Sequence, residues 1–147
     1  MKFFATSQSW VPFIIRITLG LVILPHGLQK TLGLFGGYGF AGTMGFFTGS
    51  MGVPAVVAFL VIMAESLGAL SLIFGFITRF SAASLILVML GAVLMGHYDN
   101  GFFMNWYGNQ KGEGFEYHLL VIGMAASLVV SGAGKFSIDN LIAKKAS

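Results

Sequence analysis

Four long apolar segments constrain this chain more than any other feature of its sequence. They cover approximately residues 10–30, 54–77, 79–97 and 115–131. A helix needs about 20 apolar residues to cross a hydrocarbon core of about 30 Å. Only 9% of the 147 residues are charged, whereas an ordinary soluble domain carries roughly 25%. The sequence therefore predicts an all-α membrane protein in contact with the lipid bilayer, with residues 1–147 forming one domain.

The connections between these segments predict an antiparallel bundle of four transmembrane helices. Only Thr78 and Arg79 are clearly polar between the second and third segments, so the two segments must form a tight antiparallel helical hairpin. Positive charges favour the side of the bundle that holds both termini, with Lys2, Arg79, Lys135, Lys144 and Lys145 on it and Lys30 and Lys111 on the other side. By the positive-inside rule, this bias predicts that both termini are cytoplasmic.

Two ionisable residues fall deep inside the predicted spans, where each needs a partner or a function because burying a charge in hydrocarbon is costly. They are Arg16 and Glu65. Helix geometry at 1.5 Å per residue puts them at similar depths, about 9 Å from Trp10 and about 16 Å from Pro54. We therefore predict a buried Arg16–Glu65 ion pair or proton relay.

Small and polar residues recur at helical spacing, which predicts faces directed to the bundle axis. The stripes contain Arg16, Gly20, Ile23, Gly27 and Lys30 in the first helix, Glu65, Gly68, Leu72 and Gly75 in the second, and Glu116, Gly123 and Ser127 in the fourth. The simplest interpretation of the glycines is close helix packing.

The glycine-rich and aromatic connection of residues 33–52 is typical of an interfacial or partly re-entrant segment. Residues 98–114, the other outer connection, are expected on the outer membrane surface.

A polar cluster at the outer ends of the helices is the best candidate for a ligand-binding site. Its members are His26, Lys30, His97, Glu116 and His118. Imidazole at near-neutral pH accepts or transfers protons and can hydrogen-bond a quinone carbonyl. The alternative is that helix ends at a membrane surface collect polar residues without binding anything. Glu116 and His118 are two residues apart and point to opposite faces of a regular helix, so no metal site is predicted.

Other functions lack the residues that they require. The chain has no cysteine, so any redox centre belongs to a partner. Its net charge of +3 is dispersed among apolar runs, without the basic stripe of a nucleic-acid-binding protein. We find no nucleophile with an adjacent base and no phosphate-binding loop after a strand.

The order and spacing of several motifs resemble those of the DoxX family of small four-helix bacterial membrane proteins. The resemblance rests on Arg16 with Leu19-Gly20, His26-Gly27 and Lys30, Glu65 with Gly68, Leu72, Gly75 and Thr78-Arg79, Glu116-Tyr117 with Leu119-Leu120, and Gly132-Ala133-Gly134-Lys135 with Ser137 and Asp139. It implies a multi-pass protein of the bacterial cytoplasmic (inner) membrane. The family is named after the membrane subunit of a thiosulfate:quinone oxidoreductase, which implies oxidoreductase partners.

Three functions follow as hypotheses from the residues and the resemblance. The first is a membrane subunit or accessory protein of a quinone-linked oxidoreductase, with quinone as its ligand. The second is a non-enzymatic scaffold or assembly factor for a partner protein. The third is haem ligation by His26 and His97, disfavoured because His97 lies out of phase with the small residues of its helix. Homo-oligomerisation is compatible with all three.

Overall fold

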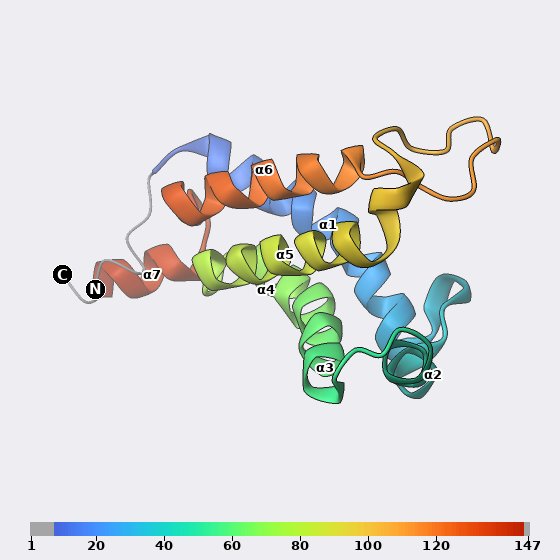
Figure 1. Cartoon of the computed structure of the whole chain (residues 1–147). Helices are drawn as coiled ribbons and strands as arrows, with labels where there is room; N and C mark the ends of the chain where they lie inside the picture. The colour runs from blue at the N-terminus through green and yellow to red at the C-terminus, as the bar shows by residue number, and fades with distance from the viewer. Residues whose placement is uncertain (1–7, 146–147) are drawn as a thin grey trace.

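The computed structural model describes residues 8–145, and every regular element in that range is helical (Figure 1). Three helical stretches are long and apolar enough to cross a membrane: Trp10–Leu32, Ala55–Phe74 and Thr78–Asn100. A fourth apolar helix, Glu116–Ser131, has 16 residues, a length of about 24 Å at 1.5 Å per residue. The predicted all-α class is confirmed, and each observed segment lies within a few residues of its predicted bounds.

Helix α1 (Trp10–Leu32) has well-defined ends. The Ser9 side chain accepts a hydrogen bond from the amide of Val11, 3.1 Å away, and Gly33 ends the helix with a φ of 71°, which glycine adopts readily. The predicted inward stripe of this helix is confirmed at Gly20 and Ile23, which are buried together with Arg16 and Gly27.

The second stretch consists of α3 (Ala55–Met63), a π-helical turn η4 (Ala64–Gly68) and α4 (Ala69–Phe74). Its contact with α1 depends on two glycines. A Cβ at Gly27 would overlap the backbone of Glu65, and one at Gly20 would overlap Ile73. The glycines therefore let the two helices approach to backbone contact, as the small-residue stripe predicts.

Helix α5 (Thr78–Ala92) continues through a π-helical turn η5 (Val93–His97) and a 3-10 turn η6 (Tyr98–Asn100). It lies side by side with α6 (Glu116–Ser131) along its length (Figure 1). The apolar core joins these two helices to α1 and α4, and it contains Leu19, Ile23, Leu72, Leu85, Ala125 and Leu128.

The predicted inward stripe of the fourth helix is wrong at Gly123. The buried face of α6 contains His118, Val121, Ala125 and Leu128 instead, because this is the face that packs on α5. Gly123 is exposed, and a Cβ there would meet no atom within 4 Å.

We call the end of the molecule formed by the end of α1, helix α2 (Gly39–Gly45) and residues 101–115 the loop end. Figure 1 shows α2 almost end-on, so it runs across the bundle rather than along it. Residues 101–115 form an irregular loop that returns to the start of α6, where the amide of Phe115 donates to the carbonyl of Gly101 at 3.2 Å. The crosswise helix fits the interfacial segment expected for residues 33–52.

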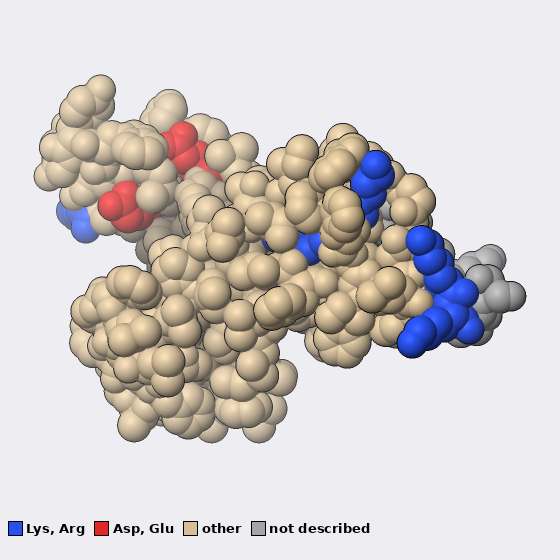
Figure 2. Space-filling view, turned by 180° about the vertical axis from the view of Figure 1, so that it is seen from behind, with Lys and Arg blue, Asp and Glu red and all other residues tan. Residues whose placement is uncertain are grey.

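We call the opposite end, formed by the start of α1, residues 132–137 and helix α7 (Ile138–Lys145), the terminal end. Helix α7 was not predicted from the sequence. Figure 2 shows Lys and Arg side chains gathered at this end, whereas Asp and Glu side chains appear on one lobe of the loop end. Of the basic residues expected together, Lys135, Lys144 and Lys145 lie here, and Lys2 lies outside the described residues.

Candidate functional site

Arg16 is completely buried, and its guanidinium group joins α1 to the end of α4 and to residues 132–137 of the terminal end. It donates hydrogen bonds to the backbone carbonyls of Leu72 (3.0 Å), Ile73, Ala133 (2.9 Å), Lys135 (3.0 Å) and Phe136 (2.6 Å). The last carbonyls of a helix have no partners within the helix itself. Arg16 thus satisfies the end of α4 and ties it to the segment that precedes α7.

The predicted Arg16–Glu65 ion pair is wrong. Gly20 packs against Ala69 and Ile73, and Gly27 packs against Glu65. This register puts Arg16 level with the end of α4, about two helical turns beyond Glu65. The depth of a residue within its own helix does not reveal how far the two helices are displaced relative to each other along the bundle.

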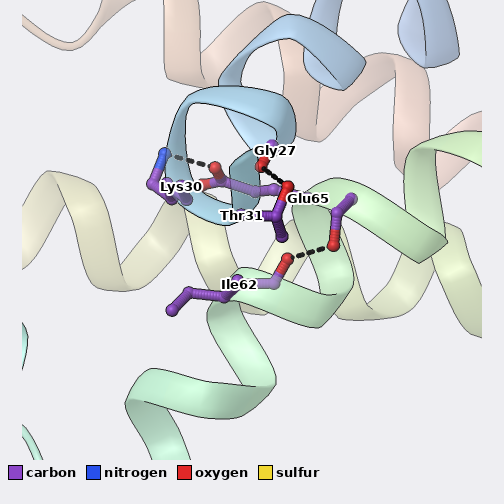
Figure 3. A network of polar contacts seen from close by, with 6 residues as sticks. Gly27, Lys30, Thr31, Ile62 and Glu65 are labelled. Atoms are coloured by element: carbon purple, nitrogen blue, oxygen red, sulfur yellow. Dashed lines mark hydrogen bonds and ion pairs between the residues drawn. The ribbon is translucent and has the colours of Figure 1, made fainter. Parts of the chain in front are cut away.

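Glu65 instead forms an ion pair with Lys30, another residue of the predicted site. The side chains point toward one another from η4 and from the last turns of α1 (Figure 3). The Glu65 side chain is 8% exposed and that of Lys30 is 23% exposed, so one end of the pair is accessible. Two neighbouring hydroxyls are bound within their own helices, Thr31 to the carbonyl of Gly27 at 2.8 Å and Ser66 to that of Ile62 at 2.6 Å.

A pocket of about 250 Å³ opens beside this ion pair at the loop end. Lys30 forms part of its wall, together with the aromatic side chains of Tyr38, Phe46 and Phe47. The rings of Tyr38 and Phe46 stack with their centroids 6.5 Å apart. The pocket therefore combines flat apolar walls with one charged group, a combination common in sites for small organic ligands.

Two buried polar atoms belong to the first turn of α6. The hydroxyl of Tyr117 and Nδ1 of His118 have no hydrogen-bond partner among the residues that the structure describes. The His118 ring packs between those of Tyr117, at 5.6 Å, and His97, at 4.2 Å between centroids. His97 in turn bonds through Nδ1 to the carbonyl of Glu113, 2.8 Å away.

We call five residues of the bundle the polar line. They are the ion pair of Lys30 and Glu65 and the three neighbouring rings of Tyr117, His118 and His97. Both Glu65 and His97 belong to π-helical turns, and such turns are frequent at functional sites. Four of the five are site residues predicted from the sequence. The fifth, Tyr117, is not among them, although it stands beside Glu116 in the motif of the family resemblance.

Two members of the predicted outer cluster do not join the polar line. His26 is exposed on α1. Glu116 binds the 101–115 loop, since its Oε1 accepts hydrogen bonds from the amide of Met104 at 2.9 Å and the indole of Trp106 at 3.1 Å. The predicted gathering of three histidines at one site is therefore wrong, because His26 lies on an outward face of its helix. Within residues 8–145, no three side chains of His, Asp or Glu are placed to hold one metal ion.

Asp139 has a structural role that sequence analysis did not assign. Its buried carboxylate accepts hydrogen bonds from the amides of Ile77 (2.7 Å) and Thr78 (2.9 Å), which lie at the start of α5. A carboxylate at this position satisfies free amides of a helix N-terminus. Asp139 also donates its own amide to the carbonyl of Gly75 at 2.9 Å. Together with Arg16, it fixes α7 to the ends of α4 and α5.

The chain is similar to known proteins over most of its length. A family model described as DoxX matches residues 11–98. "Putative oxidoreductase CatD" of Bacillus subtilis is 28% identical over 131 residues, covering 89% of this chain and 86% of that protein. "Inner membrane protein YqjF" of Escherichia coli is 32% identical over 130 residues, covering 88% and 90%. "Inner membrane protein YphA" of Escherichia coli is 24% identical over 139 residues, covering 92% and 93%. No solved structure matches the chain.

These relatives and the apolar helices agree on where the protein resides. Two of the relatives are named as inner membrane proteins, and the structure contains several helices long enough to cross a bilayer. The chain is a multi-pass protein of the bacterial inner membrane.

Proposed function

Since the chain belongs to the DoxX family, we propose that it is a membrane subunit or accessory protein of a quinone-linked oxidoreductase. In this proposal four helices span the bilayer, both termini are cytoplasmic, and the loop end binds a quinone or a similar lipid-soluble ligand. A relative is named as an oxidoreductase, and this supports the reaction class. The observation that carries the proposal is the Lys30–Glu65 pair beside an aromatic pocket, in a bundle whose described part also buries polar atoms of Tyr117 and His118 without hydrogen-bond partners.

The pocket suits the head group of a quinone better than a whole molecule. Its volume of about 250 Å³ is below the roughly 300 Å³ at which pockets for drug-sized ligands begin, so the isoprenoid tail would remain in the lipid. A quinone ring is flat and carries two carbonyl acceptors. Phe46 and Phe47 would flank the ring, and the Lys30 ammonium group would donate to one carbonyl.

The remainder of the polar line would supply protons. Reduction of a quinone to a quinol takes up two electrons and two protons, and the electrons would come from a redox centre in a partner subunit. Tyr117 and His118 both have an unused hydrogen-bonding atom inside the bundle, and hydroxyl and imidazole groups transfer protons readily. Glu65 would pass a proton from this series to the ligand beside Lys30.

Ligand titration tests the proposal. We expect a short-chain ubiquinone or menaquinone analogue to bind the purified protein saturably in mild detergent, and an azido derivative of it to label residues that line the pocket. Lys30→Met should weaken binding at least tenfold, or about 1.4 kcal/mol, because it removes the donor. Tyr107→Phe is the control, since Tyr107 is 90% exposed on the loop. Labelling spread over the lipid-facing surface, or equal affinity in Lys30→Met, would contradict the proposal.

A specific observation favours the scaffold hypothesis as second candidate. Arg16, Asp139 and Glu116 all have their hydrogen-bonding capacity directed to the protein's own backbone or loop, so these three have structural roles. Under this hypothesis the polar line also only holds the helices. A ligand-free protein that co-purifies stoichiometrically with one partner, and loses it when the 101–115 loop is altered, would favour the scaffold.

A further inference from the structure

A second hollow, separate from the polar line, lies at the terminal end. It is a groove of about 660 Å³ between the end of α4 and helix α7. Phe74 and Leu141 give it an apolar side, whereas Lys135, Lys144 and Asn140 give it a polar side. The groove thus has a basic side and an apolar side, which are complementary to the anionic head group and the hydrocarbon chain of a phospholipid.

Helix α7 has the pattern of a helix that lies in a membrane interface. Ile138 and Leu141 are 39% and 61% exposed, and Phe136 just before the helix is 71% exposed. Lys144 and Lys145 occupy the last turn and are also exposed. Exposed apolar side chains beside lysines place such a helix at the level of the lipid head groups.

The groove is held in shape by bonds on either side of it. The amide groups of Gln8 and Asn140 bond to each other at 2.7 and 3.3 Å. Asp139 joins α7 to the start of α5, and Ser137 accepts from the amide of Asn140 at 3.2 Å. Binding therefore needs little ordering of the protein, which favours affinity.

We propose that this groove binds an anionic phospholipid of the adjacent leaflet, with the phosphate at Lys135 and Lys144 and an acyl chain along Phe74 and Leu141. Charge complementarity supports this occupant, because basic pockets beside membrane-spanning helices recognise anionic head groups. The acidic residue nearest in sequence, Asp139, does not oppose it, since both of its oxygens bind backbone amides of the protein. The inference does not depend on the proposed quinone site.

Lipid retention by the purified full-length protein tests the inference. We expect native mass spectrometry with equal amounts of phosphatidylglycerol and phosphatidylcholine to show at least a fivefold preference for phosphatidylglycerol. Lys135→Gln with Lys144→Gln should abolish that preference. Lys111→Gln, which removes a positive charge from the exposed loop at the opposite end, should leave it unchanged. Equal preference in the wild type and the double variant would overturn the proposal.

Further measurements test whether the double variant has merely misfolded and whether the groove binds a free phosphate ester instead of a lipid. Lys135→Arg with Lys144→Arg keeps both charges and should retain the preference. In a Trp106→Phe protein, Trp10 is the remaining tryptophan, and its ring lies 4.6 Å from Nζ of Lys135. Brominated phosphatidylglycerol should quench Trp10 more strongly than brominated phosphatidylcholine, and equal quenching would contradict the site. Displacement of the lipid by millimolar glycerol 3-phosphate would show a site for a free phosphate ester instead and would also overturn the proposal.

Discussion

The Arg16→Leu protein is expected to lose its folded state in the membrane. The substitution removes the hydrogen bonds that Arg16 donates to five buried or partly buried carbonyls, and within residues 8–145 only the carbonyl of Leu72 also accepts from a backbone amide, that of Gly75. An unsatisfied buried polar group costs about 1–3 kcal/mol, so the total is comparable to the about 5–15 kcal/mol by which a whole domain is stable. The measurement is the amount of monodisperse protein recovered by size-exclusion chromatography in mild detergent, which should fall to background.

Two control variants separate this role from charge alone. Arg16→Lys keeps the charge but has three donors on one nitrogen, so it cannot reach all five carbonyls, and we expect an intermediate yield. Lys111→Leu also removes one positive charge, from an exposed loop position, and should give the wild-type yield. A wild-type yield for Arg16→Leu would show that the hydrogen bonds around Arg16 do not hold the terminal end together.

Separating Lys30 from Glu65 is expected to have the second largest effect. Lys30→Met leaves a carboxylate, 8% exposed, without its partner, and removal of one member of a buried pair costs about 3–5 kcal/mol. Removing both groups as Lys30→Met with Glu65→Leu should recover most of that loss, because replacing a buried pair by apolar side chains is often neutral. The free energies of unfolding of the wild type, Lys30→Met, Glu65→Leu and the double variant, measured by denaturant titration in one detergent, give the coupling energy.

This double-mutant cycle also separates the contribution of the ion pair to stability from its contribution to quinone binding. We expect a coupling energy above about 2 kcal/mol, within the range found for residues in direct contact. The double variant should then be folded yet unable to bind a quinone analogue. Additive effects of the two single changes would mean that the ion pair does not form, and retained quinone binding in the double variant would separate the pair from the ligand site.

Apolar length and helical periodicity predicted the all-helical class and the approximate bounds of the apolar helices, because the length of an apolar run determines whether a helix can cross a bilayer. The span bounds and the inward face of α1 follow from apolar runs and from spacings of three and four residues. The same reasoning misplaced the inward face of α6, where Gly123 is exposed. A glycine on a membrane helix indicates that close packing is permitted, but whether a neighbour actually packs there depends on tertiary arrangement.

The sequence predicts which residues belong to the candidate site, but not which of them contact one another. Depth and periodicity selected Glu65 and Lys30, and position at the outer helix ends selected His97 and His118. The structure pairs Glu65 with Lys30 and places the ring of Tyr117 beside those of His118 and His97. The wrong partner for Glu65 arose because depth within a single helix says nothing of how far two helices are displaced along each other. Contacts between Gly27 and the Glu65 backbone set that displacement, and no pattern in either helix alone specifies it.

The terminal end was the least predictable part of the molecule. Asp139 and the short helix α7 follow the Gly132-Ala133-Gly134 segment and have no long apolar run, so no membrane span is predicted there. Their arrangement depends on Arg16, more than 100 residues earlier in the chain, and on the start of α5. Long-range hydrogen bonding of this kind can be recognised only once the helices are placed.

Extraction of bound ligand from protein purified out of native membranes tests the proposed function most directly. Mass spectrometry of the extract should detect about one quinone per wild-type chain. The folded Lys30→Met/Glu65→Leu variant should carry little or none, whereas Tyr107→Phe should carry the wild-type amount. Wild-type protein that contains no quinone, or a double variant that retains it fully, would contradict a quinone site beside the Lys30–Glu65 pair.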